Sequence, residues 1–332
     1  MTAPDPIRAI ADAVLYEGYV LWPYRRSALK NTHRWTFGGV YPQAHAEARD
    51  AGDDPWTMQT QVLIEGAGDT RVSVALRFLH IVWRQVVDAG GGAVDELTIG
   101  AERHLTWEEA LEREVGLPPM ALDELAAGRR VPISVAAGEE RETLGPEGAI
   151  VRSWEPLEGA LLVSAEPLGA ALHRITARIE NTTRWAGGPR EAALRRTFCS
   201  AHTTLRAGDG GAFVSQTDPP AALREAANAC ENQGTWPVLV GEAGARDTVL
   251  SSPIILEDHP RIAPESPGDL FDGGEIDQLL ILNILQLTDE EKAEARASDP
   301  RVRELLDRSE GLTPEELMRL HGRTARELQV RS

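Results

Sequence analysis

Cys199 and His202 lie close together in the sequence, and a thiol and an imidazole can bind a metal ion or form a nucleophile with its base. The surrounding residues predict a β-strand, in which successive side chains point to opposite faces. This alternation places Cys199, Ala201 and Thr203 on one face and His202 on the other. A shared metal would need a β-bulge between them. We therefore expect Cys199 to be a buried structural cysteine.

Cys230 is the second of only two cysteines, so the chain can form neither a disulfide framework nor a four-cysteine zinc site. A reactive thiol needs an electropositive setting that lowers its pKa. Glu225 and Glu231 flank Cys230, and Arg224 is the one nearby cation. The sequence therefore predicts a cysteine that packs at the end of a helix.

No short motif for metal or nucleotide chemistry occurs in the chain. The eight histidines form no HExxH or similar pair, and the chain contains no P-loop, strand-linked GxGxxG or GxSxG. The acidic stretch from Glu265 to Asp277 does not have calcium-loop spacing, and its carboxylates favour a helix N-terminus. We accordingly expect no cofactor and no bound metal. A zinc site assembled from distant segments stays open as an alternative.

A basic and aromatic segment near the N-terminus is the unusual local feature. Arg25, Lys30, Arg34 and Trp35 lie among several tyrosines and tryptophans in a chain whose net charge is -18. Such a segment can hold an anionic group or dock an acidic partner. The alternative is that these cations pair with the chain's own carboxylates and aromatic rings. We take these four residues as the predicted partner-binding site.

In the first third of the chain, the spacing of apolar residues predicts two helices and a β-hairpin. Apolar residues from Ile7 to Leu15 recur at helical spacing. Residues 57–65 and 72–78 predict the arms of a β-hairpin that turns through residues 66–69. The run Thr106-Trp107-Glu108-Glu109 has the pattern of a capping box, which predicts a short amphipathic helix through Val115.

The middle third predicts antiparallel sheet. Residues 159–166 and 172–181 are two runs joined by a turn, and residues 198–205 and 212–216 form a second such pair. Further strands are expected at residues 236–240 and 249–256. Short strands at this spacing indicate a sandwich or a curved sheet.

The C-terminal part of the sequence, from Pro264, predicts helices after a proline-rich linker at residues 264–268. The run from Ile276 to Leu287 is apolar on nearly every side, so it would be buried or covered by a partner. Two later capping boxes predict further helices. The expected fold is α+β, with an antiparallel β-rich body, an N-terminal helix and a C-terminal helical segment. Its expected parts are residues 1–125, 126–263 and 264–332.

Length and charge exclude several classes of function. With 332 residues the chain can bury a sizeable core without disulfides or metals. The excess of 52 acidic over 34 basic residues argues against a general nucleic-acid binder. No uncharged stretch approaches the roughly 20 residues that span a bilayer. We expect a cytoplasmic protein with no membrane span.

Four segments resemble an uncharacterised protein family when they are taken together. They are residues 17–31, residues 34–39, residues 234–241 (the run Gly234-Thr235-Trp236-Pro237-Val238-Leu239-Val240-Gly241), and the stretch from Ser251 through Gly273. The family is similar to proteins encoded beside high-affinity uptake [NiFe]-hydrogenases, chiefly in actinobacteria. The resemblance implies a role in hydrogenase production or assembly. It supplies no catalytic residues.

The expected function is therefore that of a non-catalytic accessory protein that binds a hydrogenase subunit or maturation factor. One alternative is a metal-dependent hydrolase whose site brings together His202, His259 and nearby carboxylates. Another is a homo-oligomeric structural protein with residues 276–287 as its interface.

Overall fold

The computed structural model describes residues 38–49, 54–100, 102–208 and 210–260, together with single positions near each end of the chain (residues 8, 10–12, 15, 288, 289, 292, 293, 296, 303, 306, 307 and 311). This part of the chain is rich in β-structure, and the strand pairs are antiparallel. Positions 8, 10–12 and 15 are helical. The predicted linker, the apolar run 276–287 and the predicted binding residues Arg25, Lys30, Arg34 and Trp35 lie outside the described residues.

The five-stranded sheet has the order β13-β1-β11-β10-β7. Its strands are β1 (Thr57–Glu65), β7 (Arg129–Val135), β10 (Leu157–Pro167), β11 (Leu172–Asn181) and β13 (Ala212–Phe213). The predicted pairing of residues 159–166 with residues 172–181 is confirmed, because β10 and β11 are neighbours joined by a tight turn. Along β11 the residues His173, Ile175, Ala177 and Ile179 are buried, as the alternation predicts.

The eight-stranded sheet is organised around one long strand, β2 (Arg71–Asp88). Its path runs β14-β15-β12-β2-β9-β8, and β6 and β3 pair with β2 off that path. The other strands are β3 (Ala93–Val94), β6 (Trp107–Ala121), β8 (Gly138–Thr143), β9 (Gly148–Trp154), β12 (Cys199–Ala207), β14 (Trp236–Leu239) and β15 (Thr248–Ser252). The predicted strands at residues 236–240 and 249–256 are therefore present and pair with each other.

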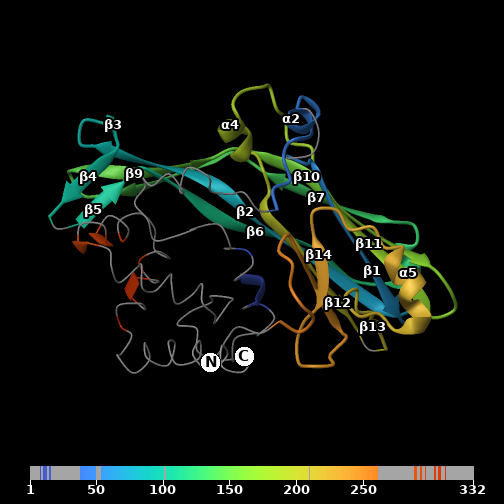
Figure 1. Ribbon diagram of the computed structural model, residues 1–332. Coiled ribbons are helices and arrows are strands. Elements are labelled where there is room, and N and C mark those ends of the chain that lie inside the picture. The colour runs from blue at the N-terminus through green and yellow to red at the C-terminus, as the bar shows by residue number, and fades with distance from the viewer. Residues whose placement is uncertain are drawn as a thin grey trace.

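The two sheets pack face to face around one apolar core (Figure 1). Val74 and Phe78 from β2 meet Leu161 from β10 and Ile175 from β11 in that core. The rings of Phe78 and Phe198 lie 4.7 Å apart, centroid to centroid. The eight-stranded sheet continues beyond this sandwich toward β3, β9 and the small pair β4 (Glu96–Ile99) and β5 (Glu102–Leu105), at the left of Figure 1.

Short helices lie in the connections between the strands. They are α2 (Gln43–Glu47), α3 (Leu122–Leu125), α4 (Arg190–Leu194) and α5 (Arg224–Asn228), with a 3-10 turn, η2 (Ala221–Leu223), before α5. Helices α2 and α4 lie close together at the top of Figure 1. Among the described residues, no helix has the length and apolar character needed to cross a membrane.

Two of the predicted hairpins, residues 57–65 with 72–78 and residues 198–205 with 212–216, are wrong. In each case the two arms are strands that do not pair with each other. Strand β1 pairs with β11 and β13, whereas β2 belongs to the other sheet, so residues 66–70 cross between sheets. Similarly, β12 pairs with β2 and β15, and β13 pairs with β1. A glycine-rich turn permits either a hairpin or a crossover, and burial of both strands against opposite sheets decides between them.

The predicted helix after Thr106 is wrong, because residues Trp107–Ala121 form β6. The Thr106 hydroxyl does not cap a helix. It donates to the carbonyl of Val94 and accepts from the backbone N–H of Val86. Strand β6 pairs with β2 along almost its whole length. The long neighbouring strand thus overrides a local helix signal.

Candidate functional site

A β-bulge in β12 changes the geometry expected at Cys199 and His202. The register against β2 shifts between them, and Ser200 has a positive φ of 51°. Cys199 lies opposite Leu79, and His202 lies opposite Arg77. Leu79 and Arg77 are two residues apart on β2, so they share a face. The prediction that Cys199 and His202 point to opposite faces is therefore wrong, because the extra residue of the bulge turns both toward the outer face of the eight-stranded sheet.

Gly38 holds the bulge from outside the strand. Its carbonyl accepts a hydrogen bond from the N–H of Ala201 at 3.0 Å. Gly38 has a φ of 56°, and a Cβ atom there would lie 2.5 Å from Cγ of Pro253. Only glycine fits this conformation and this approach. Gly38, Trp236 and Pro253 thus belong to the same part of the fold, since β14 pairs with β15 just before Pro253.

Neither thiol has the environment of a nucleophile. Cys199 is fully buried, and burial raises the pKa of its thiol, with Glu108 adding to the effect. Its Sγ contacts the carbonyl of Thr197 at 3.7 Å. Burial also raises the pKa of Cys230, which packs beside α5. Both thiols are therefore protonated near neutral pH, as expected for structural cysteines.

His202 and Arg77 lie side by side on the outer face, and both are buried. Burial lowers the pKa of His202 to about 4. Its Nδ1 lies 3.2 Å from the carbonyl of Ser200, which only accepts, so Nδ1 carries the proton. Burial acts to lower the pKa of Arg77, but the hydrogen bonds to Asp12 and Glu112 outweigh it and the pKa is raised.

A cavity of about 460 Å³ adjoins Arg77 on this face. Its polar lining comprises Arg8, Ser73, Arg77, Glu114, Thr204 and Arg206. Arg8 pairs with Glu114 at 3.6 Å. We name this space the Arg77 cavity. It is of the size that holds a small ligand.

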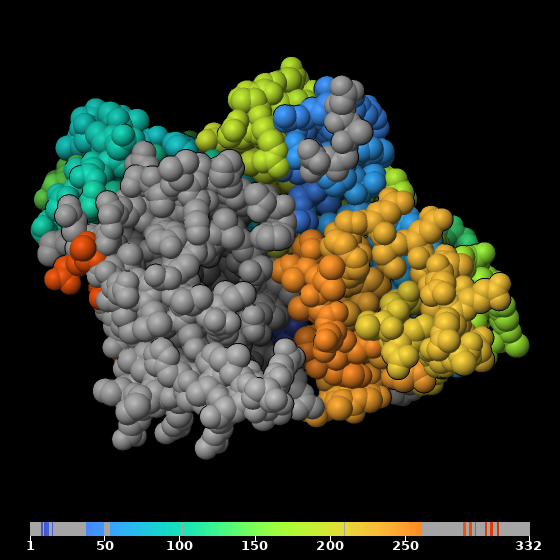
Figure 2. All heavy atoms as spheres, viewed as in Figure 1, coloured from blue at the N-terminus to red at the C-terminus, as the bar shows by residue number. Residues whose placement is uncertain are grey.

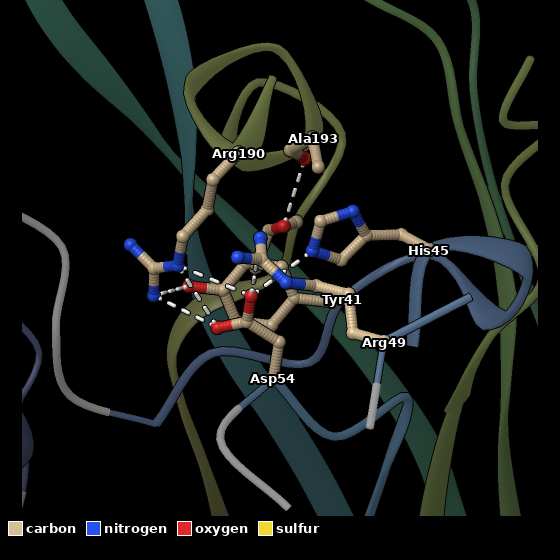
Figure 3. A network of polar contacts seen from close by, with 7 residues as sticks. Tyr41, His45, Arg49, Asp54, Arg190 and Ala193 are labelled. Carbon is tan, nitrogen blue, oxygen red and sulfur yellow. Dashed lines mark hydrogen bonds and ion pairs between the residues drawn. The ribbon is translucent and has the colours of Figure 1, made fainter. Parts of the chain in front are cut away.

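A buried polar network joins α2 and α4 to the end of the sandwich (Figure 3). The carboxylate of Asp54 accepts from Nε and Nη2 of Arg190 at 3.0 and 2.9 Å. Nε2 of His45 lies 3.0 Å from the same carboxylate, and Arg49 approaches it at 3.6 Å. Arg190 also donates to the hydroxyl of Tyr41. In the space-filling view the α2 and α4 segments lie against each other, in blue and yellow-green (Figure 2).

The charge states of Asp54 and Tyr41 are typical of a structural network whose hydrogen-bonding groups are already paired. Burial acts to raise the pKa of Asp54, but the hydrogen bonds from Arg190 and His45 outweigh it and the pKa is lowered. Burial, together with the charge of Asp54, raises the pKa of Tyr41. Asp54 is therefore an ion and Tyr41 a neutral phenol at neutral pH. The partners of the carboxylate already occupy both of its oxygens.

A wider groove of about 730 Å³ lies next to this network. We name it the Trp185 groove, and its lining includes Gln43, Glu47, Thr182, Arg184, Trp185 and Arg196. The ring of Trp185 lies edge-on to His45, with centroids 5.6 Å apart. Arg196 lies over Trp185 at 5.8 Å and pairs with Glu155 at 2.8 Å. Arg184 is exposed and forms no ion pair with the described residues.

Sequence reasoning missed the Asp54 network and the Trp185 groove. Arg190 and Asp54 are 136 positions apart, so no local spacing could connect them. His202 and His259, which the hydrolase alternative brings together, have different neighbours: His259 contacts Leu239 and Gly244. Among the described residues, no three His, Cys, Asp or Glu side chains gather as a metal ion would require.

The chain matches no protein family, and no curated protein is significantly similar to it.

Proposed function

We propose that this protein is a non-catalytic accessory protein that acts by binding a partner protein through the Trp185 groove. The observation that carries the proposal is the lining of that groove: an aromatic ring, an exposed arginine and a second arginine held in place by Glu155. Tryptophan and arginine are the residue types that contribute most to protein interfaces. The process that we propose is [NiFe]-hydrogenase production, on the basis of the resemblance of the sequence.

The rigid wall of the groove supports a binding role. Trp185 packs against His45, which the Asp54 network fixes in turn. A preorganised wall reduces the entropy that binding costs. The titratable groups behind it are engaged with one another, and the two thiols are protonated. This chemistry suits recognition better than catalysis.

The partner that the groove fits is an acidic segment of a protein. Arg184 offers an exposed guanidinium to a carboxylate, and the ring of Trp185 offers apolar area beside it. Arg25, Lys30, Arg34 and Trp35 are the further contact residues that we propose, since they present the same residue types.

Co-purification tests this proposal in cells that express a [NiFe]-hydrogenase. We expect the tagged chain to recover a hydrogenase subunit or maturation factor, and Arg184→Glu to reduce the recovered amount at least about tenfold, because charge reversal opposes an acidic partner. The double variant Arg25→Glu with Arg34→Glu tests the second set of residues.

Arg129→Glu is the matched control, since Arg129 is an exposed arginine on β7, outside the groove. It should leave the recovery unchanged. Recovery of the tagged chain with no hydrogenase protein, or equal loss in Arg184→Glu and Arg129→Glu, would overturn the proposal. Circular dichroism of each purified variant shows that the fold is retained.

A further inference from the structure

We infer that the partner segment bound in the Trp185 groove carries a basic side chain beside its carboxylate, and that Glu47 selects this basic side chain. The inference rests on the proposed function and goes beyond it, because it names the charge pattern that the groove recognises. It assigns a specificity-determining role to an exposed residue of α2.

The two walls of the groove present charges of opposite sign. Arg184 lies in the connection between β11 and α4, whereas Gln43 and Glu47 lie on α2. Arg184 and Glu47 are both exposed, and neither forms an ion pair with any residue in the described part of the chain. The groove therefore offers one uncompensated positive and one uncompensated negative charge to a partner.

Gln43 holds the carboxylate of Glu47 at the groove. Its Nε2 donates to Oε1 of Glu47 at 2.8 Å, four positions further along α2. The amide is neutral, so this hydrogen bond orients the carboxylate and leaves its negative charge in place. His45, on the same helix, is fixed by Asp54 and contacts Trp185. The negative wall of the groove is thus as well anchored as the aromatic one.

Arg196 does not alter this charge balance. It lies over the ring of Trp185 and pairs with Glu155 at 2.8 Å, so its charge is compensated within the protein. A segment that bears only carboxylates would satisfy Arg184 and be repelled by Glu47. A segment that also bears a lysine or arginine would satisfy both charges. Specific recognition commonly combines such an attractive group with one that repels the wrong partner.

Reversing the charge of Glu47 tests the inference by the sign of its effect. The full chain with Glu47→Lys is used for co-purification from cells that express a [NiFe]-hydrogenase, and the recovered hydrogenase protein is quantified. We expect recovery to fall about tenfold, because a lysine repels the basic side chain of the partner. A segment with carboxylates alone would be recovered in larger amount, since the groove becomes more positive. Increased or unchanged recovery would overturn the inference.

Two further variants separate charge from structure. Glu47→Gln keeps a side-chain oxygen that can accept from Gln43 and removes only the charge, so recovery should fall about threefold. Glu102→Lys is the matched control, because Glu102 is an exposed glutamate on β5, outside the groove, and its replacement changes the net charge equally. This control should leave recovery unchanged. Equal loss in Glu47→Lys and Glu102→Lys would contradict a role specific to Glu47.

The outcomes distinguish this inference from the proposed function. If the parent chain recovers a hydrogenase protein and Arg184→Glu loses it, but Glu47→Lys does not reduce it, the groove binds a partner that Glu47 does not select. If the parent chain recovers none, the proposed function and the inference are both overturned. Circular dichroism of each variant shows that the fold is retained.

Discussion

The carboxylate of Asp54 gathers side chains from two distant segments of the chain. His45 and Tyr41 come from the stretch around α2, and Arg190 begins α4. A buried carboxylate is stable as an ion only where donors replace water around it. The network therefore fixes the α2 and α4 segments to each other by charge, beside the apolar cluster that contains Tyr41, Ala193 and Leu194.

Replacing Asp54 with asparagine should destabilise the protein, because the Arg190 guanidinium loses its ionic partner. Breaking a fully buried pair costs about 3–5 kcal/mol, and the partial exposure of Arg190 reduces the expected loss to about 2 kcal/mol. Urea unfolding measures it. The control is Glu166→Gln, which removes the exposed partner of Arg174 and should change the unfolding free energy by less than about 0.5 kcal/mol. Equal effects of the two variants would contradict the role of the network.

Two buried histidines should make stability depend on pH. Burial lowers the pKa of His80 and of His202 to about 4, against 6.5 in the unfolded chain. Between these values the unfolded chain binds protons that the folded chain does not, so their contribution is full above pH 6.5 and is lost as the pH falls toward 4. Each histidine should lose about 2 kcal/mol between pH 7 and pH 5.

Urea unfolding at the two pH values measures this loss. In His202→Gln and His80→Gln the difference between pH 7 and pH 5 should be smaller than in the parent protein by about 2 kcal/mol each. A variant that keeps the full difference would show that its histidine is protonated to the same extent in both states.

Among the elements, strands with clear alternation were predictable, but of the three predicted hairpins only the pairing of β10 with β11 was correct. Alternation at β10 and β11 is strong because one face meets the core, and a short polar turn joins them. At β1 and β2 the same kind of turn leads into a different sheet. At Thr106 the local helix signal is overridden by a long neighbouring strand. Pairing depends on partners that are distant in sequence, and local patterns carry no record of them.

The candidate sites, like the strand pairing, depend on residues that are distant in the sequence and could be predicted only in part. The prediction that Cys199 is buried is confirmed, but the bulge at Ser200 was not predictable because a serine with positive φ has no sequence signal. The residues that line the Arg77 cavity are spread between positions 8 and 206 of the chain, so no local spacing pattern connects them.

Gly38 offers a test of how tightly the segment before β1 docks onto β12. Gly38→Ala should destabilise by about 1 kcal/mol through its positive φ and by more through the contact with Pro253. Gly128→Ala is the control, because Gly128 also has a positive φ, of 70°, but its Cβ would meet open space. Thermal unfolding compares them. Equal destabilisation would mean that the contact at Pro253 yields without cost.

At the scale of the whole molecule, both sheets draw on distant parts of the chain. Strand β1 pairs with β11, and β2 pairs with β9 and β12, so each sheet contains strands from both before and after position 125. One apolar core joins the two sheets. Neither residues 1–125 nor residues 126–263 contain all the strands that enclose this core, so neither part can form it alone.

We therefore predict that residues 38–260 unfold in one cooperative transition. Tryptophan fluorescence and far-ultraviolet circular dichroism should give the same midpoint in urea, because the sheets lose their common core together. Residues 1–125 and 126–263, produced separately, should each lack that transition. Two separate midpoints, or a cooperative transition in either fragment, would show that the ranges fold as independent domains.

The strand β8 closes one end of the eight-stranded path, and its residues are almost all exposed. Glu139, Glu140 and Glu142 lie along it. A terminal strand is a template on which a second molecule can add its own strand and begin a fibre. These three glutamates outnumber Arg141 on the strand, so its net charge is negative and repels an identical strand. The sheet is thereby protected from growing into aggregates at this edge, and the acidity of the chain has a local use in keeping copies apart.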